Sequence, residues 1–296
     1  MIDRSSWSRL GQTSARRVRR AAGDLRTRAR TRVRPSAPPL PSAGFPPAPD
    51  AVPLLDRLDD AQLAELNGLL PWRGFTVDGL GRRFGDRAWP GKRDEPQPVP
   101  PRYVTMAAEQ FDLAGKHVFE VGCFEGIHTI GLCRVAGRVT AVDSRVANVV
   151  KTIVRAAFYG ARPDVFVCDV EAWDDDQALT ADVWHHVGVL YHLRDPVRHL
   201  LRLGTLCREG LLLDTHVADE ATATESMTVD GRDYRYRRYA EGGAADHFSG
   251  AYDHAKWLLL ADVVGLLERA GFARVDVLDE RAQRNGPRVT LVARRS

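Results

Sequence analysis

The sequence predicts an α/β protein with a doubly wound sheet of seven strands and helices on both faces. From Lys116 onward, short apolar runs alternate with longer segments whose apolar residues recur at helical spacing. This alternation is typical of a mostly parallel sheet, whose ligand crevice lies at the carboxyl ends of the strands. A turn with two glycines, Gly122 and Gly126, follows the first run and opens the first helical pattern. Such a turn suits a cofactor, because glycines let the ligand approach the backbone closely and the start of the helix offers it unpaired N–H groups.

The elements of this unit follow from the two periodicities. We expect strands over 117–121, 138–142, 164–168, 182–190, 210–215, 272–279 and 288–295, and helices over 126–136, 145–160, 195–207 and within 255–271.

The first 53 residues differ from the rest in composition. Residues 1–34 hold eleven arginines against Asp3 and Asp24, so this arm carries about +9 and the remainder of the chain about −6. The prolines of 35–53 disfavour both helix and sheet. We expect residues 1–53 to be a basic arm and linker, disordered or partly helical. The arm is either a solvated extension or a helix that binds RNA or a membrane surface through phosphate contacts.

Residues 54–110 form a second region. Leucines recur at helical spacing over 54–70 until Pro71, and a stretch rich in Gly, Pro, Trp and Arg follows. We expect a helical cap that wraps across the main domain, which spans 111–296.

Cysteine usage and hydropathy limit the classes of protein. The four cysteines are widely spaced, without a C-x-x-C pair or zinc spacing, so we expect no disulfide framework, no structural metal and a cytoplasmic location. No apolar run approaches the roughly 20 residues of a membrane span. The N-terminal residues carry charges at the positions where a signal peptide has its apolar stretch.

The glycine turn favours one cofactor over another. Its spacing fits poorly with the NAD fingerprint, because Phe124 stands where a middle glycine is usual. Glu120 precedes the turn and would repel a pyrophosphate, but its charge suits the ammonium and sulfonium of S-adenosylmethionine (SAM). Asp143 and Asp169 end the next two strands, where carboxylates can bind ribose hydroxyls and the adenine amino group.

Residues 116–215 resemble the class I SAM-dependent methyltransferases. "FEVGCFEG" is similar to the first motif of that family, and "AVDSR" and "CDVEAW" to the second and third. The resemblance implies a Rossmann-like methyltransferase sheet with SAM as cofactor. The implied cofactor site comprises Glu120, Gly122, Cys123, Phe124, Gly126, Asp143, Ser144, Asp169, Val170, Val187 and Gly188.

The segment Val187 to Leu203 carries a narrower resemblance. Its "GVLYH-R-P" core is similar to the bacterial tRNA wobble-uridine methyl and carboxymethyl transferases and to related small-molecule methyltransferases. In such enzymes this strand end faces both the sulfonium and the acceptor. A base is needed only when the acceptor is a hydroxyl or similar weak acid, and the candidates are Tyr191, His192 and His216. The alternative for His192 is a structural hydrogen bond.

An insertion over about 217–253 lies where this fold usually builds a substrate cover. Tyrosines and arginines alternate in "GRDYRYRRYAEGG", which predicts either a wall for an aromatic or anionic substrate or a hairpin with one packed face. The candidate substrate residues are Tyr234, Tyr236, Arg238, Tyr252 and Trp257. The histidines near Tyr252 match no standard metal spacing.

Two acceptors compete. The acidic remainder of the chain and a cover of single-pocket size favour an oxygen of a small molecule or sugar. The "GVLYH" segment, the Tyr/Arg stretch and the basic arm favour tRNA. A carboxymethyl version needs a cation for the extra carboxylate, for which Lys92, Arg93 and Arg102 are positional guesses. A third hypothesis, a non-catalytic SAM-binding scaffold, is suggested by Phe124.

Overall fold

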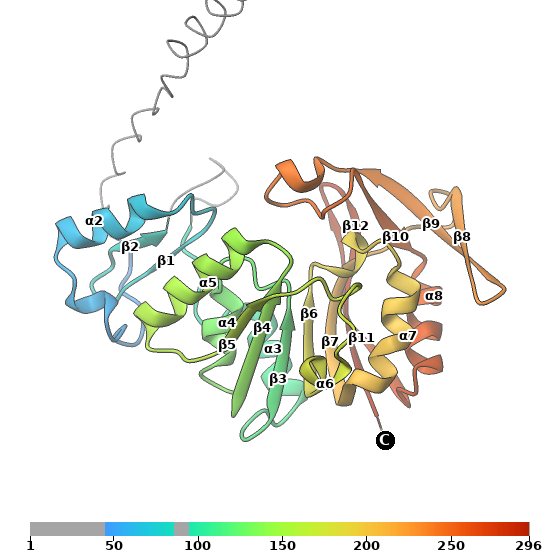
Figure 1. Ribbon diagram of the computed structural model, residues 1–296, viewed down its shortest axis with the longest axis horizontal. Coiled ribbons are helices and arrows are strands. Elements are labelled where there is room, and N and C mark those ends of the chain that lie inside the picture. Colours follow the sequence, from blue (N-terminus) through green and yellow to red (C-terminus); the bar gives the residue numbers. More distant parts are fainter. Residues whose placement is uncertain (1–44, 86–94, 296) are drawn as a thin grey trace, which may run out of the picture. The chain divides into compact units, whose positions relative to one another are not determined.

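A computed structural model describes residues 45–85 and 95–295 (Figure 1). The arm, most of the linker, Lys92 and Arg93 therefore lie outside the described residues. In the described part, no helix has both the length and the apolar character needed to cross a membrane.

Seven strands form the central sheet, in the order β11-β12-β7-β6-β3-β4-β5. The strands β3 to β7 are parallel to one another, whereas β12 is antiparallel to both β7 and β11. The bounds are β3 (His117–Val121), β4 (Arg138–Asp143), β5 (Asp164–Val167), β6 (Ala181–Val187), β7 (Cys207–His216), β11 (Arg274–Gln283) and β12 (Gly286–Arg294). The predicted doubly wound sheet is confirmed.

Helices cover both faces of this sheet because successive strand residues point to opposite sides. Val118 packs in one apolar cluster with α3 (Arg102–Gln110) and α4 (Ile127–Leu132), whereas its neighbour Phe119 packs in another with α7 (Pro196–Leu206) and α8 (Leu260–Arg269). Phe119 stacks on Trp184 of β6 with ring centroids 4.5 Å apart. The remaining helices of this region are α5 (Val146–Tyr159) and the short α6 (Asp176–Leu179).

Two buried histidine pairs belong to this packing. His185 of β6 contacts His128, and His186 contacts His199, each at 3.0 Å between ring nitrogens. Burial lowers the pKa of His185 well below its usual value and that of His186 to about 4, so both rings are neutral at pH 7. The two side chains lie on opposite faces of the sheet, as their alternation predicts.

The segment before the main sheet packs on α5. It contains the 3-10 turn η1 (Leu55–Arg57), α2 (Asp60–Leu69), and a hairpin of β1 (Phe75–Val77) and β2 (Arg83–Gly85). Trp72 and Phe84 share an apolar cluster with Tyr159 of α5. Glu125 of the glycine turn accepts hydrogen bonds from Arg73 N at 2.7 Å, from Gly74 N at 3.0 Å and from Lys151 Nζ at 2.8 Å. This buried anchor fixes the segment beside the turn.

The insertion forms a second, three-stranded antiparallel sheet of β8 (Glu225–Val229), β9 (Arg232–Ala240) and β10 (His254–Leu258). Asp230 and Gly231 both have positive φ in the tight turn between β8 and β9, as a type I′ hairpin requires. The expected helix within 255–271 is α8, which begins only at Leu260. Residues 255–258 instead pair with β9, and their buried Ala255 and Trp257 alternate with the less buried Lys256.

The end of β6 also differs from the expected strand over 182–190. The strand stops at Val187, since Gly188 takes a left-handed φ of 77°, and a 3-10 turn η2 (Leu190–His192) follows. This change of direction carries Tyr191 and His192 into the crevice at the end of the sheet.

Candidate functional site

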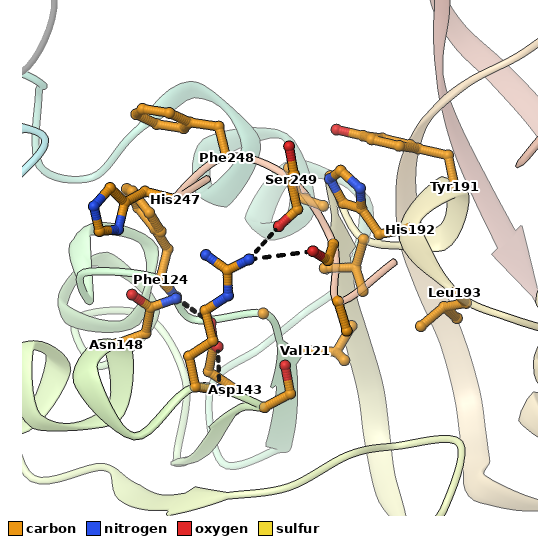
Figure 2. Close-up of a pocket in the computed structure, with 18 of the residues that line it drawn as sticks. Val121, Phe124, Asp143, Asn148, Tyr191, His192, Leu193, His247, Phe248 and Ser249 are labelled. Carbon is orange, nitrogen blue, oxygen red and sulfur yellow. Dashed lines mark hydrogen bonds between the residues drawn. The ribbon is translucent and has the colours of Figure 1, made fainter. Parts of the chain in front are cut away.

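A cavity of about 840 Å³ lies at the carboxyl ends of β3, β4 and β6. Its volume is in the upper part of the roughly 300–1,000 Å³ range of small-molecule sites. Of the predicted cofactor residues, all line it except Gly126, which caps α4 and packs on Thr152 instead. Tyr191, His192 and His216 line the same cavity. Figure 2 shows Asp143, Asn148 and Phe124 on one side and Tyr191 and His192 on the other. We call these the donor side and the acceptor side.

Glu120 is the most deeply buried of the three strand-end acids, Glu120, Asp143 and Asp169. Its side chain accepts a hydrogen bond from Thr129 Oγ1 at 2.5 Å, and the residue is 2% exposed. Burial raises the pKa of Glu120 to about 8, against a smaller lowering by the Thr129 hydroxyl. A cationic group in the cavity would favour the ionised form, so this position is suited to a positive ligand.

Asp143 is held in a fixed orientation at the end of β4. Its Oδ2 accepts from Phe124 N and from Asn148 Nδ2, each at 3.1 Å, and its Oδ1 accepts from Arg145 N at 2.9 Å. Burial raises its pKa from the ordinary value, an effect that these donors oppose. Asp169 follows β5, is exposed, and accepts from Glu171 N at 3.0 Å. Three strand-end acids therefore line one side of one cavity, as the sequence predicts.

Phe124 occupies a backbone conformation that usually belongs to glycine. Its φ of 51° is left-handed, which costs a residue with a side chain of order 1–3 kcal/mol. Its ring lies 5.4 Å from that of Phe248 in the insertion, and both residues line the cavity. The side chain thus forms part of the cavity wall and contacts the cover above it.

Gly122 has a stricter requirement. Its φ is 74°, and a Cβ at this position would lie 2.3 Å from Val189 Cγ2. The replacement Gly122→Ala is expected to destabilise the fold by about 2 kcal/mol or more, since the left-handed conformation alone costs roughly 1–2 kcal/mol. Urea unfolding measures this loss. Gly265→Ala in α8 is the control, because nothing lies within 4 Å of its Cβ, and it should be neutral or stabilising. Equal stability of the Gly122→Ala variant and the unaltered protein would contradict the assigned backbone.

The acceptor side brings three rings together. His192 Nδ1 lies 2.8 Å from Glu241 Oε2, and the Tyr191 ring lies 4.2 Å from the His192 ring. His216 Nδ1 donates to the carbonyl of Pro287 at 2.9 Å, and burial lowers its pKa to about 4. Because a carboxylate only accepts, His192 Nδ1 must be the protonated nitrogen, which leaves Nε2 unprotonated in the neutral ring. His192 is therefore the histidine of this side that has a carboxylate partner.

A buried charge cluster lies beneath the acceptor side. Asp214 of β7 is fully buried and pairs with the guanidinium groups of Arg281 and Arg288, while Thr290 Oγ1 donates to it at 2.8 Å. Arg288 lines the cavity, with its guanidinium 5.7 Å from the Tyr191 ring centroid. The predicted site residues did not include this cluster. Its signal in the sequence is Asp214, an acid near the end of the predicted strand "LLLDT".

Arg145 is a second residue that the sequence analysis missed. It is the last residue of the second motif, and its guanidinium donates to four backbone carbonyls of the insertion, those of Gly243, Asp246, Ser249 and Gly250, at 2.7–3.3 Å. Figure 2 labels Ser249, whose backbone carbonyl accepts one of these hydrogen bonds at 2.7 Å. We call residues 241–252 the cover segment; most of its residues line the cavity.

The candidate substrate residues divide between the cavity and the packed interior. Tyr252 lines the cavity, whereas Tyr234 and Tyr236 are buried in the main apolar cluster. Trp257 is stacked between His216 and Tyr239, at 4.3 Å and 4.6 Å, and lies behind the lining. Arg238 pairs with Asp253 outside the lining. Tyr239, rather than Tyr234 or Tyr236, is the hairpin tyrosine that reaches the cavity.

The remaining cation guess, Arg102, lies at the start of α3. Its guanidinium pairs with Asp279 at 3.1 Å and does not line the cavity. No group of three or more His, Cys, Asp or Glu residues that could hold a metal ion occurs within residues 45–85 and 95–295.

The chain is similar to several known methyltransferases. No family model matches it. The tRNA U34 carboxymethyltransferase of Marinobacter nauticus is 31% identical over 186 residues, 62% of this chain and 51% of that protein. The same-named protein of Idiomarina loihiensis is 28% identical over 76% of this chain and 64% of its own length. A ubiquinone biosynthesis O-methyltransferase of Xanthomonas euvesicatoria pv. vesicatoria is 25% identical over 61% of this chain and 71% of its own length.

The chain spans about half to two thirds of the length of these tRNA U34 carboxymethyltransferases. Among solved structures, the N-terminal domain of EvdMO1 with SAH bound is 24% identical with a TM-score of 0.63, over 80% of this chain and 95% of that one. The same domain in the presence of SAH and D-fucose is 23% identical with a TM-score of 0.62, over the same shares of the two chains. The predicted class I methyltransferase fold, and the resemblance to both groups of relatives, are confirmed.

Proposed function

We propose that this chain is a SAM-dependent methyltransferase that transfers a methyl group to an oxygen of a small molecule or sugar. One observation carries the proposal: acids suited to a cationic donor and a histidine suited to a hydroxyl acceptor line opposite sides of one cavity (Figure 2).

The donor side would hold SAM through its three acids. Glu120 lies deepest and would take the cationic methionine end, where its ionised carboxylate is stabilised by the opposite charge. Asp143, already oriented by three donors, would accept from the ribose hydroxyls. Asp169, exposed at the end of β5, would accept from the adenine amino group. This order follows the order of the strands β3, β4 and β5 in the sheet.

The chemical step then requires alignment and one proton acceptor. Bound SAM would supply the methyl group: its carbon–sulfur bond would break as the acceptor oxygen bonds to the methyl carbon, and neutral S-adenosylhomocysteine (SAH) would be the leaving group. The hydroxyl proton passes to Nε2 of His192, because Nδ1 is engaged with Glu241. Tyr191, beside His192 and Arg288, would orient the acceptor.

The lining favours a small acceptor. The cover segment and Tyr239 line one side of the cavity, where a small acceptor would share the volume with the donor. Three arginines are among the described residues that line the cavity. Arg145 donates to backbone carbonyls, Arg288 pairs with Asp214, and Arg284 lies on an exposed turn. A polynucleotide usually requires several cations at its phosphates.

The alternative is a tRNA wobble-uridine methyl or carboxymethyl transferase, supported by the sequence similarity to tRNA U34 carboxymethyltransferases. The carboxymethyl form would need a cation for the extra carboxylate of its donor. Arg288 lines the cavity beside Tyr191, and it shares Asp214 with Arg281, which also pairs with Asp279 at 2.8 Å. The Arg288 guanidinium would take that role.

A labelling experiment separates the two functions. The protein is incubated with methyl-labelled SAM and either total RNA or a small-molecule and sugar extract, and the label is followed into each fraction. We expect label in the small-molecule fraction. Label in RNA would replace the proposed acceptor with the alternative, and tight SAM binding without transfer to either fraction would favour the scaffold hypothesis.

A further inference from the structure

We propose that Glu241 and Arg145 latch the cover segment over the bound donor, and that closure of this latch positions His192. Glu241 is thus a positioning residue, and Arg145 controls the exchange of the donor. The inference rests on the proposed function for the identity of the donor, but the latch itself is a set of contacts that can be tested without an acceptor.

Glu241 joins the cover segment to the acceptor side. Its side chain is 8% exposed, and its Oε2 accepts from both His192 Nδ1 at 2.8 Å and Gly250 N at 3.1 Å. One oxygen therefore fixes the tautomer of the histidine and the path of the cover at the same time. A hydrogen bond to one ring nitrogen commonly determines which nitrogen of a histidine is free to act.

Gly250 brings the cover backbone directly against His192. A Cβ on Gly250 would lie 2.7 Å from His192 Cβ and 3.0 Å from its carbonyl oxygen. The close approach leaves His192 little freedom to turn while the cover is down. The position of the ring therefore depends on the position of the cover.

Arg145 joins the same segment to the donor side. Its backbone N–H donates to Asp143, and its guanidinium donates to the carbonyls of Gly243, Asp246, Ser249 and Gly250. All four carbonyls accept from the same guanidinium. Hydrogen bonds from a charged donor are stronger than those between neutral groups. Arg145, two positions after the proposed ribose acid, is thus the main fastening of the cover segment.

The two fastenings couple donor and acceptor sides through the cover segment. With the cover held by Arg145, the donor is enclosed, so exchange of SAM for SAH requires the guanidinium contacts to open. With the same cover released, Glu241 leaves His192. The histidine is therefore set for proton transfer only while the donor is enclosed, which keeps water from the reacting groups.

The first test removes the Arg145 fastening. In Arg145→Ala we expect the dissociation rate of SAH, measured by stopped-flow fluorescence, to rise about 10- to 100-fold, as the loss of charged hydrogen bonds predicts. The amide of Gly250 should exchange hydrogen for deuterium faster even without ligand. Arg238→Ala is the matched control, since Arg238 pairs with Asp253 outside the cavity, and it should leave both rates unchanged.

The second test concerns Glu241 and uses nitrogen NMR of the His192 ring. Glu241→Gln keeps an acceptor oxygen and should keep the proton on Nδ1, whereas Glu241→Leu should shift it toward Nε2 or mix the tautomers. Glu220→Gln, an exposed glutamate paired with Arg235, is the control. Unchanged Gly250 exchange in Arg145→Ala, or an unchanged His192 tautomer in Glu241→Leu, would overturn the inference. Failure of the unaltered protein to bind SAH would instead contradict the proposed function.

Discussion

Glu120→Gln is expected to lower the affinity for SAM about 10- to 100-fold while making the ligand-free protein more stable at pH 8. The first effect follows because a buried carboxylate contributes about 1.5–3 kcal/mol to a charged hydrogen bond, and each 1.4 kcal/mol is tenfold in affinity. The second follows because glutamine keeps the shape and the acceptor for Thr129 without a charge to bury. Titration calorimetry and thermal unfolding measure the two effects.

The stability gain expected of Glu120→Gln depends on pH, because Glu120 binds its proton more tightly in the folded chain than in the unfolded one. Burial raises the pKa of Glu120 in the folded chain to about 8, from an ordinary value of 4.5. Below pH 4.5 both folded and unfolded chains hold the proton, and no stability is lost. As pH rises from 4.5 toward 8, the unfolded chain releases the proton and the folded one keeps it, so stability falls by up to a few kcal/mol. The stability advantage of Glu120→Gln should therefore grow between pH 5 and pH 8.

The same linkage applies to ligand binding. A cationic donor near Glu120 favours the ionised carboxylate, so binding of SAM near pH 7 should release a proton, which calorimetry detects in buffers of different ionisation enthalpy. Glu268→Gln, an exposed substitution on α8, is the control. A Glu120→Gln variant that binds SAM as well as the unaltered protein would remove Glu120 from the donor site.

His192→Asn is expected to lower turnover on a hydroxyl acceptor by about 10²- to 10⁴-fold, the usual contribution of a general base. The affinity for SAM should stay within about threefold, because His192 lies on the acceptor side and a threefold change is about 0.6 kcal/mol. Steady-state kinetics with the acceptor found by labelling, together with calorimetry, separate the two quantities.

His254→Asn is the matched control for this variant, since His254 pairs with Asp253 and does not line the cavity. It should leave turnover unchanged. If His192→Asn loses SAM affinity in parallel with turnover, the histidine shapes the loop after β6 and is not the base.

The donor side could be predicted from the sequence because chain order and strand periodicity determine it. In a parallel sheet, residues that end successive strands meet at one edge, so Glu120, Asp143 and Asp169 were expected to lie together. The backbone conformation of Phe124 was not predictable, because a left-handed φ is usual for glycine and uncommon for phenylalanine. Its contact with Phe248 depends on how the insertion folds back.

The cover could not be predicted in the same way. Arg145 binds carbonyls about 100 positions further along the chain, and backbone acceptors leave no mark in a sequence. Glu241 is 49 positions from His192 along the chain.

The hairpin shows the limit of periodicity. Alternation predicts that Tyr234 and Tyr236 share a face and that Tyr239 lies on the other. It does not reveal which face meets the cavity, and the structure assigns that face to Tyr239. Likewise, the short apolar run at 255–258 fits a strand as well as a helix, and pairing with β9 decides for the strand.

Titration of the purified protein with SAM, and in parallel with NAD, tests the central claim most directly, because the cavity acids are proposed to select a cationic donor over a pyrophosphate. The account predicts saturable heat with SAM at a stoichiometry of about one, as expected of a single preformed site, and no binding of NAD. Binding of NAD in this cavity, or no binding of SAM, would contradict it.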